Sequence, residues 1–63
     1  MDAEFLRLPQ VIQRVGLSRS EIYRRVSRSE FPRPRAYPNS RKRFWLSTEI
    51  AEWQRRAVGG SIA

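Results

Sequence analysis

The sequence contains no cysteine and no histidine among its 63 residues. Without cysteine there is no disulfide and no thiolate metal site, and without histidine the usual general base and zinc ligand are missing. No apolar run approaches the ~20 residues that a membrane-spanning helix needs, and the first residues lack the apolar stretch of a secretory signal. We therefore expect a protein of the reducing cytoplasm, with no cofactor, no metal site and no membrane segment.

The short length also limits the fold. A chain of this size forms one domain at most, and folding hides only ~60 % of the surface that the unfolded chain exposes. The large apolar residues are therefore needed inside. The expected core residues are Leu6, Leu8, Val11, Ile12, Val15, Leu17, Ile22, Val26, Phe31, Trp45, Ile50 and Trp53.

Positive charge is the abundant feature, with 13 basic residues against 6 acidic ones and a net charge of +7. Residues 1–18 and residues 44–63 each sum to zero, so residues 19–43 carry the whole excess. Almost all of these basic residues are arginine, whose planar side chain fits phosphate and the edge of guanine. The alternative is a merely solvated basic surface, but a block this concentrated favours a protein that binds nucleic acid.

The first half of the chain predicts a short helix. Residues 5–8 alternate in polarity and are expected to pack as an extended lead-in. Pro9 suits the first turn of a helix, where a missing N–H costs little, and apolar residues at helical spacing follow it. The pattern predicts a helix over about 9–15 that ends at a left-handed Gly16.

A second helix is predicted over about 19–28. Ser18 and Glu21 have the spacing of a capping box, and Ile22 and Val26 supply an apolar inward face. Only three residues separate this helix from the first one. Two short helices joined so closely, with glycine in the turn, are typical of a helix-turn-helix.

A basic hairpin is predicted next. The prolines within residues 29–34 exclude a helix there. Residues 35–37 and 43–46 are strand candidates, and a Pro-Asn-Ser turn lies between them. Three consecutive basic residues, 41–43, then fall near the tip of a two-stranded wing.

A third helix is predicted to begin at a Ser47 or Thr48 cap and to stop at Gly59-Gly60. The predicted fold is thus mainly helical with a small two-stranded β wing: a winged helix-turn-helix with three short helices. We expect one DNA-binding domain over residues 1–57 and a flexible C-terminal tail over 58–63.

Several segments together carry a resemblance to a known family. They are Phe5-Leu6-Arg7-Leu8, Val15-Gly16-Leu17-Ser18-Arg19-Ser20, Ile22-Tyr23-Arg24, Phe31-Pro32-Arg33-Pro34, Arg41 four residues before Trp45, and Glu49-Ile50 before Trp53. Over about residues 5–54 the chain resembles the AlpA-like phage regulatory proteins. These in turn look like small excisionases and the winged-helix domains of the MerR superfamily.

The resemblance implies a helix-turn-helix, a two-stranded wing and a further helix. It also implies a prophage transcription regulator, or a recombination directionality factor that bends DNA beside an attachment site. The sequence departs from the family at Ser29, where glycine is common, and in a wing that is about one residue longer and more basic.

We expect the second helix to enter the major groove of double-stranded DNA and the wing to contact the minor groove or the backbone. Arg19 and Arg24 are the candidates for guanine contacts, and Ser18 and Ser20 suit phosphate oxygens. Tyr23 either contacts a phosphate or lies half-buried between helix and wing. The full set of candidate DNA-binding residues is Ser18, Arg19, Ser20, Tyr23, Arg24, Arg25, Arg28, Arg41, Lys42 and Arg43.

Other classes of function compete with this one. A small basic RNA-binding protein has the same charge, and a protein-interaction module, such as an anti-repressor or an integrase partner, would use the second helix to touch protein. Enzyme chemistry has little support, because histidine and cysteine are absent and the six carboxylates show no evident partner arrangement, so Ser18 and Ser20 lack a base to activate them. On DNA, the expected partners are an integrase or recombinase and further copies of the chain, in the nucleoid of the cytoplasm.

Overall fold

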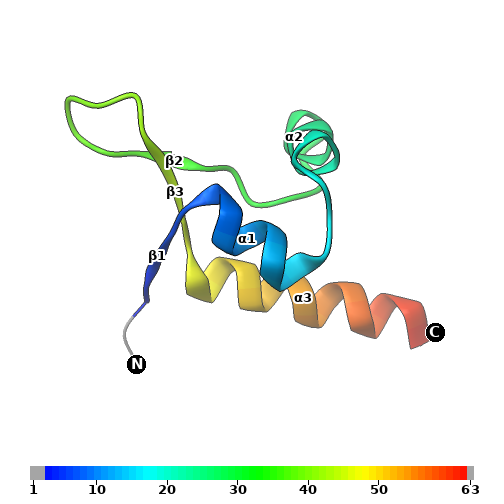
Figure 1. The fold of residues 1–63 in the computed structure, drawn as a ribbon. Helices are drawn as coiled ribbons and strands as arrows, with labels where there is room; N and C mark the ends of the chain where they lie inside the picture. Colours follow the sequence, from blue (N-terminus) through cyan, green and yellow to red (C-terminus); the bar gives the residue numbers. More distant parts are fainter. Residues whose placement is uncertain (1–2, 63) are drawn as a thin grey trace.

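The computed structural model describes the backbone of residues 3–62 and the side chains of residues 3–59. Within this range it has three helices and a small antiparallel sheet (Figure 1), so the predicted mainly helical fold with a wing is confirmed. The elements in chain order are β1 (Phe5–Leu6), α1 (Leu8–Val15), α2 (Arg19–Ser27), β2 (Arg35–Ala36), β3 (Arg43–Leu46) and α3 (Ser47–Ile62).

The predicted core is confirmed. Half of the predicted residues form the buried cluster, and the other half are partly buried and pack against it. The buried members are Leu6, Val11, Ile22, Phe31, Trp45 and Ile50. They come from β1, α1, α2, β3 and α3 and from the linker after α2, so one core joins every helix to the sheet.

The sheet has three strands rather than the predicted two, in the order β1-β3-β2. The lead-in over residues 5–8 was predicted only as extended; the structure pairs it with β3, with Leu6 opposite Trp45 and Phe5 opposite Leu46. Because β3 is the central strand, it pairs along both edges, and the β2–β3 hairpin forms the wing that projects away from the helices (Figure 1).

The same pairing changes the start of the third helix. Ser47 is the first residue of α3 and not its cap. Its hydroxyl accepts a hydrogen bond from the Glu4 N–H at 2.8 Å, and its own N–H donates to the Glu4 carbonyl at 2.9 Å. The serine therefore ties the lead-in to the helix, a long-range contact that local spacing does not reveal.

Phe44 was absent from the predicted core but is only 8 % exposed. It lies on the sheet face opposite Trp45, because neighbouring residues of a strand point to opposite faces. The Phe5 ring stacks on it with centroids 4.2 Å apart, and the Tyr37 ring packs at 4.6 Å. These three rings form a second small apolar cluster behind the wing.

The predicted ends of the first two helices are confirmed to within one residue. Gly16 adopts the left-handed conformation with φ 71°, and its N–H donates to the Ile12 carbonyl. The capping box of α2 is present: the Glu21 N–H donates to the Ser18 hydroxyl at 3.2 Å, and the Ser18 N–H donates to the Glu21 carboxylate at 3.0 Å.

The predicted helix stop at Gly59-Gly60 is wrong, because α3 continues to Ile62. A glycine inside a helix lowers stability by about 1 kcal/mol but does not by itself end the helix. The predicted flexible tail over 58–63 falls partly outside the described side chains and stays a prediction. In the described range no helix has both the length and the apolar character of a membrane span.

Ser29, just after the C-terminus of α2, has a strained backbone conformation. The Ser29 N–H donates to the Val26 carbonyl and the Glu30 N–H donates to the Arg25 carbonyl, which is the Schellman pattern that favours glycine at the left-handed position. Ser29 occupies that position with φ 60°. The departure from the family's glycine is thus accommodated at a cost in backbone strain.

We predict that Ser29→Gly raises the free energy of unfolding by about 1 kcal/mol, because glycine adopts a positive φ without strain. Ser27→Gly is the matched control: it lies inside α2, where glycine lowers stability by about 0.5–1 kcal/mol. Urea unfolding measures both. A loss of stability in Ser29→Gly equal to that of the control would contradict this explanation.

Candidate nucleic-acid interface

An open groove of about 360 Å³ lies between the wing, the start of α1 and one residue of α2. Tyr23 reaches it from α2, and the basic residues reach it from the wing. The lining residues are Arg7, Leu8, Pro9, Tyr23, Arg41, Lys42, Arg43 and Trp45. The structure thus brings together four of the predicted site residues from two distant parts of the chain.

Arg7 was not among the predicted site residues, although it lines the same groove. It is the N-cap residue of α1, and its N–H donates to the Gln10 side chain at 2.8 Å. Nothing in the local sequence places it beside the wing, because the pairing of β1 with β3 brings it there.

The exposed side of α2 carries Arg19, Ser20 and Arg24, three further candidates for DNA contact. Ile22 and Val26 face the core. Arg24 lies two positions from each of them, about 200° around the helix axis, so its exposed side chain projects directly away from the protein. Arg19 and Ser20 are also exposed, in the first turn of the helix.

Tyr23 lies where α2 meets the wing. Its ring is 39 % exposed, and its centroid is 6.3 Å from that of Trp45. Tyr23 is therefore exposed, although it lies at the junction of α2 and the wing. Contact of Tyr23 with a phosphate stays a prediction.

Ser18 serves α2 itself through the capping box. The Ser18 N–H bond to the carboxylate lowers the pKa of Glu21 below its ordinary value, and the Ser18 side chain and the charges of Arg24 and Arg25 act in the same direction. Because the Glu21 carboxylate already occupies the N-terminus of α2, this end offers an external phosphate less room than the sequence suggests.

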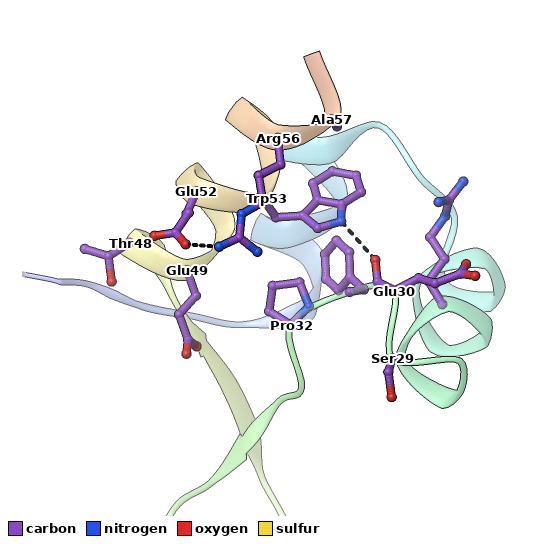
Figure 2. A pocket seen from close by; sticks show the side chains of 11 residues that line it. Ser29, Glu30, Pro32, Thr48, Glu49, Glu52, Trp53, Arg56 and Ala57 are labelled. Atoms are coloured by element: carbon purple, nitrogen blue, oxygen red, sulfur yellow. Dashed lines mark hydrogen bonds and ion pairs between the residues drawn. The ribbon is translucent and has the colours of Figure 1, made fainter. Parts of the chain in front are cut away.

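Arg25 lies apart from the other candidates. It lines a second groove, of about 790 Å³, between the linker after α2 and the side of α3. This groove also contains Glu49, Glu52 and Trp53 (Figure 2), and it shares no lining residue with the groove beside the wing. The structure does not bring Arg25 together with Tyr23 and the wing.

Three arginines of the described residues form ion pairs, and none of them is a site candidate. Arg14 pairs with Glu4, Arg35 with Glu49 and Arg56 with Glu52. The Arg35 guanidinium donates to Glu49 at 2.9 Å, and this bond raises the pKa of Arg35. The charge of Arg35 is therefore already balanced by a carboxylate.

The candidate cations have no such partner. Within the described part of the chain, no ion pair involves the candidate cations of α2, its C-terminal cap or the wing. These candidates are Arg19, Arg24, Arg25, Arg28, Arg41, Lys42 and Arg43. Their charge is therefore available to an external anion.

The wing tip has a defined backbone. Asn39 adopts φ 55°, a conformation that asparagine tolerates better than most residues. The Lys42 N–H donates to the Ser40 hydroxyl at 3.1 Å, and the Arg43 guanidinium donates to the Arg41 carbonyl at 3.1 Å. These bonds hold the basic residues in a turn rather than in a loose loop. No cluster of acidic side chains that could hold a metal ion occurs in the described range.

Two helices joined by a tight turn, followed by a basic hairpin beside the second helix, define a winged helix-turn-helix protein. The comparisons with known proteins identify the family. The chain belongs to the family described as prophage CP4-57 regulatory protein (AlpA), whose profile matches residues 4–58. The resemblance seen in the sequence is thus confirmed, and the chain is a member of a phage regulatory family.

A protein of Enterobacteria phage P4, described as uncharacterized protein ORF88, is 38 % identical over 56 residues. The matched region covers 89 % of this chain and 62 % of the phage P4 protein, so the chain spans less than two thirds of that relative. No solved structure matches the chain.

We predict that the Glu21 cap makes stability depend on pH. Because the folded pKa of Glu21 is lowered, the stabilisation is complete above the ordinary carboxyl pKa and is lost as the pH falls through the folded value. In Glu21→Gln, thermal unfolding midpoints should therefore fall less between neutral pH and about pH 3 than in the wild type.

Glu30→Gln is the control, because the Glu30 carboxylate is exposed and accepts no hydrogen bond from the described residues. It should follow the wild-type pH curve. Parallel curves for the wild type and Glu21→Gln would show that the cap contributes no pH dependence.

Proposed function

We propose that this chain is a sequence-specific double-stranded-DNA-binding regulator of a prophage or related mobile element. The observation that carries the proposal is the division of the charges. The ion pairs of the described residues involve Arg14, Arg35 and Arg56, all outside α2 and the wing tip, whereas no cation of α2 or of the wing tip forms one. Unpaired cations on a helix and an adjacent wing provide the electrostatic part of DNA binding.

The dimensions of α2 support major-groove binding. Its nine residues extend over about 14 Å at 1.5 Å per residue, which suits a groove about 12 Å wide. Arg24 then points toward the base edges and Arg19 lies at the entering end. Each good bidentate pair with guanine supplies about 1–3 kcal/mol of base discrimination.

The remaining contacts follow from the positions of the wing and the flanking residues. Arg41 and Lys42, at the wing tip, would bind the neighbouring minor groove or its phosphates. Ser20 and Arg28 would contact phosphates at the two ends of α2. Ser18 would contribute less, because its N–H and its hydroxyl are both bonded within the capping box. Arg25 faces the other groove, so its contribution would be limited to the general positive field.

RNA binding is the alternative function that the fold helps to judge. RNA modules stack bases on exposed aromatic rings of a sheet. Here Phe44 is covered by Phe5 and Tyr37 and is only 8 % exposed. Phe5 is 56 % exposed, but Phe44 and Tyr37 beside it are not, so this cluster offers a single exposed ring and not a pair. The proposal therefore favours duplex DNA, and competition between a DNA duplex and a folded RNA separates the two.

The choice between excisionase and transcription regulator depends on partners. Both roles need only sequence-specific binding and neighbours on the DNA. A single module of this size buries about 600–1,000 Å² on DNA, so we propose that specificity is gained from further copies on adjacent sites or from an integrase or recombinase. A footprint on the DNA that flanks the protein's own gene would give the site and the number of copies.

Removal of Arg24 should weaken binding to that site. We predict that Arg24→Gln reduces affinity about 10- to 100-fold, which is the loss of one bidentate guanine contact. Arg55→Gln, on the exposed side of α3, should bind as the wild type does. Gel-shift titrations measure both, and equal affinities for all three proteins would favour the protein-interaction module instead.

Binding should also depend steeply on salt. If roughly six cations neutralise phosphates, the logarithm of the binding constant should fall with the logarithm of salt concentration at a slope of about −5. Lys42→Gln should make the slope shallower by about 1 at every DNA sequence. Fluorescence anisotropy at several salt concentrations measures this, and a wild-type slope near zero would exclude the proposed surface.

A further inference from the structure

The segment that joins α2 to the wing is fixed by two tryptophans from other elements. The Trp53 indole N–H, on α3, donates to the Glu30 carbonyl at 3.0 Å, and the Trp45 indole N–H, on β3, donates to the Pro32 carbonyl at 2.8 Å. Between these two points Phe31 is buried, and its ring meets the edge of Trp53 with centroids 4.9 Å apart. Figure 2 shows the Trp53 indole above the linker and its bond to Glu30.

The linker has few other means of holding its shape. Pro32 and Pro34 have no N–H to donate. In the described residues, backbone bonding stops at the Glu30 N–H, at the end of α2, and resumes with the pairing of Arg35 in β2. The two indole bonds and the Phe31 side chain therefore fix the path of the chain between α2 and the wing.

The two tryptophans differ in what else they do. Trp45 is wholly buried at the centre of the core, so its loss would affect the whole fold. Trp53 is only partly buried and lines the 790 Å³ groove on the side remote from the wing. Its N–H can be removed while most of the core stays in place.

From this geometry we propose that Trp53 is a positioning residue for DNA recognition. Its indole N–H holds the Glu30 carbonyl and thereby fixes the wing relative to α2, so that both reach the duplex together. This role rests on the proposed function, in which Arg24 and the wing tip bind the same DNA. Trp53 itself touches no DNA, because it lies on the side of the linker that faces α3.

Trp53→Phe tests the role, because phenylalanine keeps an aromatic ring beside Phe31 and lacks the N–H donor. The first readout needs no DNA. Since the chain has no native cysteine, spin labels can be attached at Ser20→Cys on α2 and Pro38→Cys on the wing, both exposed positions. We expect a broader distribution of label-to-label distances in Trp53→Phe than in the wild type.

The second readout is DNA binding. We expect an affinity about 3- to 10-fold lower than the wild type, the effect of losing one hydrogen bond. The salt slope should be shallower by about 1–2, because wing phosphates are lost. In the footprint, protection by the wing should shrink while protection by α2 persists.

Gln54→Met is the matched control. Gln54 lies next to Trp53 on α3, and its amide donates to the Arg14 carbonyl of α1 at 2.7 Å, away from the linker. The control loses the same kind of bond and should lower stability comparably, but the label distances, salt slope and footprint should not change. A merely structural role for Trp53 would make the two variants behave alike.

A second variant decides the question if Trp53→Phe does not fold. A chain of 63 residues is accessible to chemical synthesis, and benzothienylalanine at position 53 keeps the two-ring shape and replaces only the N–H by sulfur. Wild-type label distances and an unchanged footprint in the folded variant would overturn the positioning role alone. Absence of DNA binding by the wild type would overturn the proposed function, and the label distances would still report whether Trp53 holds the wing.

Discussion

The burial of Trp45 is the constraint on which the rest of the structure depends. This residue lies in the central strand of the sheet, beside Leu6 of β1, and its indole bonds the linker at Pro32. Burying 150–250 Å² of indole at about 25 cal/mol per Å² contributes about 4–6 kcal/mol as an upper bound. A domain of this size has a total stability of only about 3–9 kcal/mol. The chain has no cysteine and so no disulfide to add stability. The Trp45 side chain therefore holds together the sheet, the linker and Tyr23 of α2, all of which contact it.

The arrangement of the acidic residues links the fold to the proposed function. Glu4, Glu49 and Glu52 each neutralise an arginine outside α2 and the wing tip, and Glu21 caps α2 from within. The carboxylates thus stabilise the scaffold and leave the cations of α2 and of the wing tip without an ion pair. A chain of the same composition and net charge could place its carboxylates beside the cations of α2 and the wing tip. Its surface would then be less suited to a polyanion.

Local signals explain what the sequence could predict. Gly16 and the capping box at Ser18 end and begin helices through contacts within a few residues, and the predicted core follows from spacing alone. Most errors involve long-range contacts: Ser47 bonds to Glu4, and β1 pairs with β3, so neither the third strand nor the position of Arg7 is visible locally. The predicted stop of α3 at Gly59-Gly60 is the exception, because there a local signal was overruled. The site residues were predicted by charge, which does not reveal that Arg25 faces another groove.

The central claim is that α2 and the wing form one DNA-binding surface, and an NMR titration tests it most directly. Backbone amide shifts of the full chain would be followed as a duplex from beside its own gene is added. The account predicts that the changes concentrate in residues 18–28 and 37–43 and spare the exposed side of α3. Changes centred on the groove between the linker and α3, or scattered evenly over the protein, would contradict it.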